Sequence, residues 1–123
     1  MRFITVIVLA LTTTACHNGP AELSAEESLK QRSKIMTELA TINGCFGCHD
    51  IDKHVLGPPW RTVAKHYKDD KNVRGYLINK VKSGGGGVWD KLTGGVPMPP
   101  YSPRVTDEHI GKLVDFILSL ETN

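Results

Sequence analysis

Apolar residues recur at helical spacing in several segments of the chain, and a nearly unbroken apolar run opens it. Residues 29–40 and 73–82 place apolar side chains three or four positions apart, which is the period of an amphipathic helix. The same spacing from 110 to 120 predicts a C-terminal helix, and a shorter helix is expected from 60 to 67. No alternating run is long enough to indicate a strand, so the pattern predicts a small all-α fold.

Residues that cap or break helices mark the ends of these segments. Ser24, followed three residues later by Glu27, is a capping-box signature for the start of the first helix. An Asn-Gly pair at 43–44 ends that helix. Residues 84–103 are rich in glycine and proline and predict a long irregular loop, a kind of segment that is often functional.

The opening apolar run, residues 3–11, follows Arg2 and leads through small residues to Cys16. A positive charge, an apolar run and small residues in that order are the pattern of a secretory signal. The alternative is a retained membrane anchor, but the run falls short of the roughly 20 residues that a spanning helix needs. The sequence therefore predicts export of the protein.

Cys16 directly follows Ala15 at the end of this signal, as the lipidated cysteine of a bacterial lipoprotein does. Thr13 departs from that pattern, which usually has leucine at this position. Ordinary cleavage nearby is the alternative, and it would leave an exposed thiol or an intermolecular disulfide in an oxidising compartment. We expect Cys16 to be lipidated. Several acyl chains on one residue would attach the protein firmly to a membrane, whereas a single chain gives only marginal binding.

Length and composition leave room for one small domain. The chain has 123 residues, and 15 Lys and Arg nearly balance 13 Asp and Glu, for a net charge of +2. This balance gives no reason to expect nucleic-acid binding. Three cysteines are an odd number, so a disulfide framework cannot use them all. We expect an export signal over residues 1–15, a polar tether over 16–25 and a single domain over 26–123.

The chemistry is indicated by a Cys-x-x-Cys-His motif at residues 45–49. Cys45 and Cys48 can lie on one side of a helical turn and form thioethers with the two vinyl groups at one haem edge, while His49 projects onto the iron. A thioredoxin-like redox pair requires a βαβ pattern that this sequence lacks, and a zinc site requires a second cysteine pair. A plain disulfide would leave His49 as a coincidence, so the motif predicts one covalent haem c.

The other face of the iron needs a second ligand or stays open. Met98 lies in a Val-Pro-Met-Pro-Pro segment, where prolines remove backbone donors and stiffen the chain. Met36 lies on the apolar side of the first helix, where packing is the better explanation. The sequence therefore predicts His49 and Met98 as the axial ligands. The remaining histidines are expected to be surface residues: His17, His54, His66 and His109.

Together these motifs resemble the small bacterial class I cytochromes c, in particular the cytochrome c-551 (c8) group. The resemblance covers residues 39–120 and rests on features in a fixed order. After the haem motif come Gly-Pro at 57–58, Val-Trp at 88–89, Pro-Met-Pro-Pro at 97–100 and the terminal helix. The resemblance implies about four helices wrapped around one covalent haem.

The resemblance also implies roles for three further residues. The carbonyl of Pro58 would accept a hydrogen bond from the ligating histidine, and Trp89 and Lys80 would contact a haem propionate. The alternatives are simple packing for Trp89 and an exposed helix face for Lys80. Two departures from the group stand out. The segment between Trp89 and Met98 is longer than in the shortest members, and Tyr101 stands where relatives often carry Asn.

An iron with histidine and methionine ligands has no open position for O₂, peroxide or a substrate, and its potential is raised. The sequence shows no nucleophile or acid–base constellation. We expect a monomeric single-electron carrier rather than an enzyme, held in the periplasm through Cys16, with redox proteins as short-lived partners. The alternatives are a gas sensor or peroxidase-like protein with an open or labile iron, and a fixed cytochrome subunit of a membrane redox complex.

Overall fold

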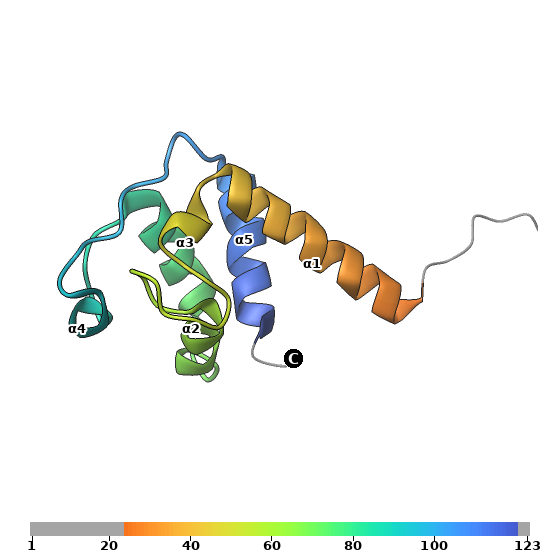
Figure 1. The fold of residues 1–123 in the computed structure, drawn as a ribbon, viewed down its shortest axis with the longest axis horizontal. Coiled ribbons are helices and arrows are strands. Elements are labelled where there is room, and N and C mark those ends of the chain that lie inside the picture. The colour runs from red at the N-terminus through yellow and green to blue at the C-terminus, as the bar shows by residue number, and fades with distance from the viewer. Residues whose placement is uncertain (1–23, 121–123) are drawn as a thin grey trace, which may run out of the picture.

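Helices make up the regular structure of residues 24–120, which are the residues that the computed structural model describes (Figure 1). Within this range no strand forms, which confirms the all-α prediction, and Gly85 and Met98 make only an isolated bridge. No helix in the range is long and apolar enough to cross a membrane. The elements are α1 (Ala25–Ile42), η1 (Cys45–Gly47), α2 (Trp60–His66), α3 (Val73–Ser83), α4 (Asp90–Thr93) and α5 (Asp107–Ser119).

The helix boundaries follow the sequence signals, with one exception. The hydroxyl of Ser24 accepts a bond from the backbone N–H of Glu27 at 3.2 Å, and the Glu27 carboxylate accepts from the Ser24 N–H at 3.0 Å. Asn43 caps the other end of α1. The exception is α4, a single turn that no apolar period announces, which makes five α-helices where about four were expected. The expected export signal, Cys16 and nearly all of the tether lie outside the described residues.

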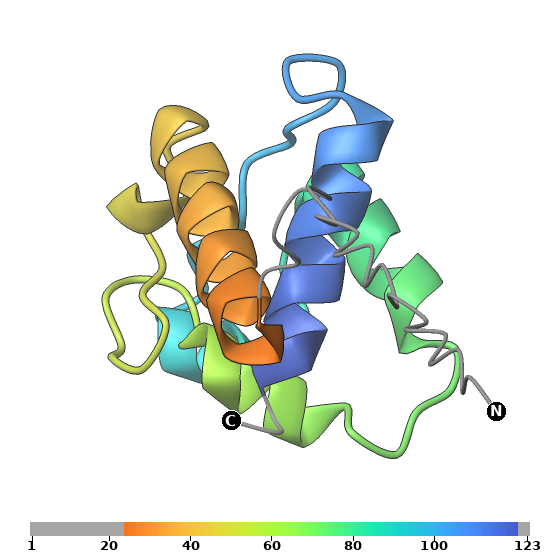
Figure 2. The ribbon, with the colours of Figure 1, turned by 90° about the vertical axis from the view of Figure 1, so that its right-hand side faces the viewer.

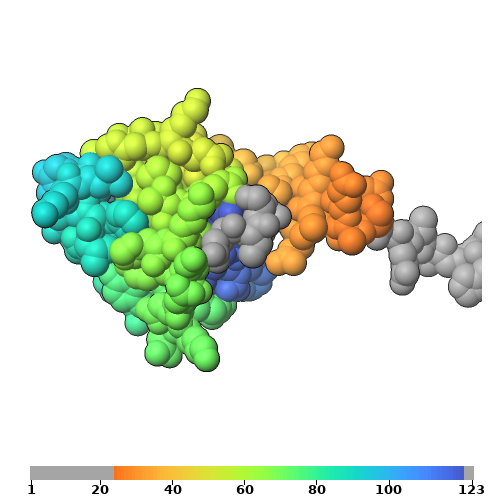
Figure 3. Space-filling model, turned by 90° about the horizontal axis from the view of Figure 1, so that it is seen from below, coloured from red at the N-terminus to blue at the C-terminus, as the bar shows by residue number. Residues whose placement is uncertain are grey.

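Only the C-terminal turns of α1 pack against the rest of the protein. Leu39 and Ala40 are the buried residues of this helix, whereas Leu29 and Ile35 are 58% and 45% exposed. The contact is with α5, and the two helices lie side by side in Figure 2. The N-terminal half of α1 projects away from the other helices, which Figures 1 and 3 both show. Half of the longest helix therefore contributes nothing to the core.

The core is built around α5, which contacts α1, α2 and α3. Thr106 begins α5 by accepting a bond from the His109 N–H at 3.2 Å, and the apolar period that follows turns one side of the helix inward. Ile110 and Val114 are completely buried. The other buried residues of this helix are Gly111, Leu113, Phe116 and Ile117.

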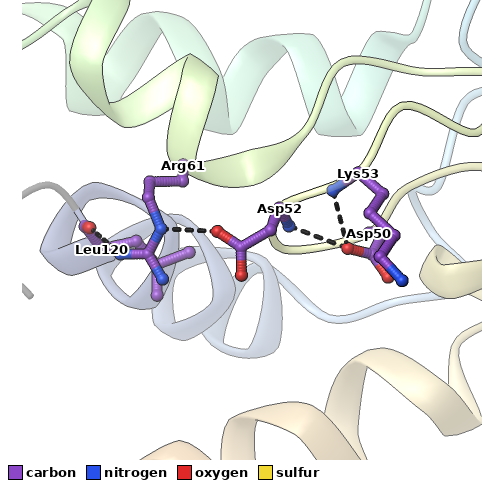
Figure 4. Close-up of polar contacts among 5 residues, drawn as sticks. All are labelled: Asp50, Asp52, Lys53, Arg61 and Leu120. Carbon is purple, nitrogen blue, oxygen red and sulfur yellow. Dashed lines mark hydrogen bonds and ion pairs between the residues drawn. The ribbon is translucent and has the colours of Figure 1, made fainter.

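Polar contacts fasten the loop that follows the Cys-x-x-Cys-His motif (Figure 4). A carboxylate oxygen of Asp50 accepts the backbone N–H groups of Asp52 and Lys53, both at 2.8 Å, and so closes a tight turn. The guanidinium of Arg61 on α2 binds Asp52 at 2.7 Å and donates to the Leu120 carbonyl at 2.6 Å. The loop is thereby fixed to α2 and to the end of α5, next to the candidate site.

Candidate haem site

A largely apolar cavity of about 250 Å³ lies between the loop after the motif, α2, α3 and the segment around α4. Residues from distant parts of the chain meet there. The structure brings together most of the site residues expected from the sequence, and these line the cavity: Cys48, His49, Pro58, Lys80, Trp89 and Met98. Cys45 packs against the core one turn away in η1, and Cys16 lies outside the described residues.

The two cysteines lie on one short helical turn. The carbonyl of Cys45 accepts the N–H groups of Cys48 and His49 at 3.2 and 3.0 Å, which closes the turn and places the three side chains close together. The cysteines form no disulfide with each other. Burial raises the pKa of the Cys45 thiol, against a smaller lowering by the cation of Arg104. Cys48 thus lines the cavity, and Cys45 packs against the core one helical turn before it.

The ring of His49 is fixed from two sides. Its Nδ1 lies 2.9 Å from the carbonyl oxygen of Pro58, and because a carbonyl only accepts, Nδ1 carries the proton. The backbone of Gly57 lies against the same ring, since a Cβ on Gly57 would fall 2.4 Å from Cε1 of His49. Burial lowers the pKa of His49, and the bond to Pro58 offsets this only in part. The imidazole is thus neutral, and Nε2 has the lone pair that a metal binds.

Met98 is held by the glycines that follow α3. Gly85 and Met98 exchange two backbone hydrogen bonds, at 2.8 and 3.3 Å, and Tyr101 donates from its backbone N–H to the Val81 carbonyl at 3.1 Å. Gly84 has a φ of +68°, and a Cβ there would lie 2.3 Å from the Met98 carbonyl. Only glycine fits a position with that φ and that contact. We call residues 97–101 the methionine strap, because backbone bonds fasten them along the end of α3.

Aromatic side chains that the sequence analysis did not single out form much of the cavity wall. The ring of Trp60 is 4% exposed and lies 6.1 Å from the ring of His49. Tyr67 packs 5.8 Å from Tyr76, and burial, together with the hydrogen bond to Tyr76, raises the pKa of Tyr67 to about 12. Trp60 and Tyr67 are seven residues apart, or two helical turns, so the period of α2 places both on one side of the helix.

The remaining expected residues have mixed surroundings. Trp89 is half-buried and packs against His66, with ring centroids 5.0 Å apart. The ammonium of Lys80 donates to backbone carbonyls of the glycine run after α3. His54 and His66 are exposed and His109 is half-buried, and none of these three lines the cavity. His17 lies outside the described residues.

These features fit a covalent haem c. Cys48, His49 and Met98 all line one largely apolar cavity, and Cys45 lies on the same helical turn as Cys48. His49 and Met98 are the donor types that hold haem iron in proteins that transfer electrons. The hydrogen bond from the imidazole to a backbone carbonyl is the outer contact that orients a ligating histidine.

Comparison with known proteins points to the same cofactor. Residues 33–121 match the family described as cytochrome c. Cytochrome c-552 of Hydrogenobacter thermophilus is 43% identical over 84 residues, which cover 68% of this chain and 80% of the relative. Cytochrome c2 of Rhodocyclus tenuis is 42% identical over 84 residues, or 68% and 89% of the two chains. The fold also matches the crystal structure of wild-type Nitrosomonas europaea cytochrome c552, with a TM-score of 0.62 and 38% sequence identity. The matched region covers 69% of this chain and 99% of that chain.

Proposed function

Because the chain belongs to the cytochrome c family and carries one covalently attached haem c, we propose that it is a single-electron carrier with His49 and Met98 as iron ligands. The thioethers are assigned to Cys45 and Cys48. One observation carries the proposal: His49 and Met98 line the same largely apolar cavity, and hydrogen bonds to or from the backbone hold both residues.

The haem iron supplies the one-electron chemistry, and the protein supplies ligands, orientation and an apolar surrounding. The carbonyl of Pro58 keeps the proton of His49 on Nδ1, so that Nε2 can bind the metal. Trp60, Val63 and Leu77 are buried apolar residues of the cavity wall that exclude water. A site with fixed ligands and little water changes its geometry little when the charge of the iron changes, and this suits a carrier better than a catalyst.

The remaining assignments complete the proposal. Trp89 and Lys80 line the cavity and are proposed to contact a haem propionate. Export leaves a domain over residues 26–123 in the bacterial periplasm, attached through the tether to a lipid on Cys16. The protein acts there as a monomer and not as an enzyme, and redox proteins donate and accept its electron through small, short-lived contacts.

The test of this function is the absorption spectrum of the purified protein, first oxidised and then reduced. We expect the weak far-red band of sulfur-to-ferric-iron charge transfer, and sharp c-type bands in the reduced form that CO does not change. A missing far-red band together with a spectrum that shifts under CO would exclude a closed site and favour a gas sensor or a peroxidase-like protein. Isolation with a stoichiometric partner from membranes would favour a fixed subunit of a redox complex.

Replacement of the anchoring cysteine tests the localisation. Cys16→Ser removes the sulfur on which the proposed lipid modification depends, so we expect the protein to move from the membrane fraction to the soluble fraction of the cell. The measurement is the share of haem protein in each fraction after centrifugation, with the native chain as control. A native chain that is already soluble, or a variant that stays with the membranes, contradicts the lipid anchor without touching the haem assignment.

A further inference from the structure

The ammonium of Lys80 turns back along the end of α3 onto the glycines that follow. Its Nζ lies 3.5 Å from the carbonyl oxygens of both Gly84 and Gly85, and it donates a shorter hydrogen bond to that of Gly86. An ammonium has three donors, and the C-terminal end of a helix favours a cation. One side chain therefore donates a close hydrogen bond to Gly86 and lies at the outer limit of hydrogen bonding from the two preceding carbonyls.

The same glycines hold the backbone of the proposed iron ligand. Gly85 donates to the Met98 carbonyl at 2.8 Å and accepts from the Met98 N–H at 3.3 Å. The backbone of Gly84 packs against the strap so closely that a Cβ would lie 2.8 Å from the nitrogen of Pro100. A shift of the glycine run would therefore strain or break the backbone bonds that hold Met98.

Lys80 has no competing acidic partner among residues 24–120, where the ion pairs involve other lysines and arginines. Lys82, two residues further along α3, instead binds Asp107 at 2.6 Å. On the far side of the glycine run, Asp90 accepts the N–H of Gly87 at 2.7 Å. The run is therefore held by an ammonium at its carbonyls and by a carboxylate at its last N–H.

We propose that Lys80 is a positioning residue for Met98: it clamps residues 84–86, and through Gly85 it keeps the methionine strap closed over the iron. The inference rests on the proposed ligation by Met98. It gives Lys80 a role separate from a propionate contact, because a propionate contact alters the charge beside the haem, whereas the clamp controls how often Met98 leaves the iron.

The test measures how fast imidazole binds to the ferric, haem-loaded protein. At saturating imidazole the rate is limited by departure of Met98, and so it reports opening of the strap. We expect Lys80→Met to raise this limiting rate about tenfold, a factor that corresponds to about 1.4 kcal/mol at 25 °C and is of the order of one charge-assisted hydrogen bond. Lys80→Arg keeps a cation with several donors and should restore a rate within about twofold of the native one.

Lys82→Met is the matched control, because it removes the same charge from the same helix without touching the glycine carbonyls. An unchanged rate in Lys80→Met, or an equal rise in Lys82→Met, overturns the clamp. If Lys80→Met does not mature with haem, Lys80→Gln is measured in its place and judged by the same criteria. A native protein without the far-red sulfur band refutes Met98 as ligand and the clamp with it, whereas a native band with an unchanged rate in the variants refutes the clamp alone.

Discussion

Met98→Ala is expected to leave the haem attached, to lower the reduction potential by on the order of 0.2 V and to open the iron to CO. A methionine thioether on the iron stabilises ferrous over ferric iron, and axial ligands set haem potentials over a range of about 0.8 V. The proposed thioethers to Cys45 and Cys48 do not depend on Met98, so attachment of the haem should survive. The measurements are a redox titration and reduced spectra with and without CO.

The control for this substitution is Met36→Ala. Met36 is half-buried on α1 and packs against the core without lining the cavity, so its loss should affect stability and leave the potential and the CO response unchanged. An unchanged potential in Met98→Ala with no CO binding would refute the ligand assignment. The pair therefore separates loss of a ligand from loss of a buried methionine.

Gly57→Ala is expected to disturb the haem site through His49, the other proposed iron ligand. The added Cβ would fall 2.4 Å from Cε1 and 2.8 Å from Nδ1 of His49, and no side-chain carbon tolerates such distances. Either the ring moves off the Pro58 carbonyl or the loop shifts. Overpacking of this kind costs about 1–3 kcal/mol, which in a domain of about 100 residues lowers Tm by roughly 5–20 °C. Thermal unfolding followed at the haem absorption, and the yield of haem-loaded protein, would measure the effect.

Gly75→Ala is the control for Gly57→Ala. Gly75 lies within α3, and a Cβ there meets nothing within 4 Å. Because alanine favours a helix over glycine, we expect Tm to stay the same or rise slightly. If Gly57→Ala also melts within a degree or two of the native protein and keeps its spectrum, the close packing of Gly57 on the imidazole does not constrain the ligand.

The long helices could be predicted from the sequence because their signals are local. The capping box at Ser24 and the apolar periods placed α1, α3 and α5 within a few residues of their observed ends. The single turn of α4 could not be predicted in this way, because four residues carry no period. It depends on the bond from Gly87 to Asp90 and on the fold around it.

The residues of the candidate site also differ in how far the sequence alone can reveal them. Cys45, Cys48 and His49 could be proposed from the sequence because haem attachment requires these residue types at one short, fixed spacing. Met98 could be proposed as a ligand because prolines surround it. The wall formed by Trp60, Tyr67 and other side chains needs α2 and α3 in place, since single positions in a helical pattern do not tell a cofactor pocket from an ordinary core. The contact of Lys80 with the glycine run depends on how the chain folds back after α3, which composition does not reveal.

The projecting half of α1 has a consequence for how far and how freely the electron can be delivered. No side chain is buried over residues 25–35, and eleven helical residues at 1.5 Å each make an arm of roughly 16 Å. With the proposed lipid on Cys16, this arm adds to the reach of the tether and still limits how far the haem domain can move from the bilayer. A redox partner in the same membrane would then meet the haem domain at an effective concentration of the order of millimolar. Electron transfer would be limited by local orientation rather than by diffusion from the bulk solution.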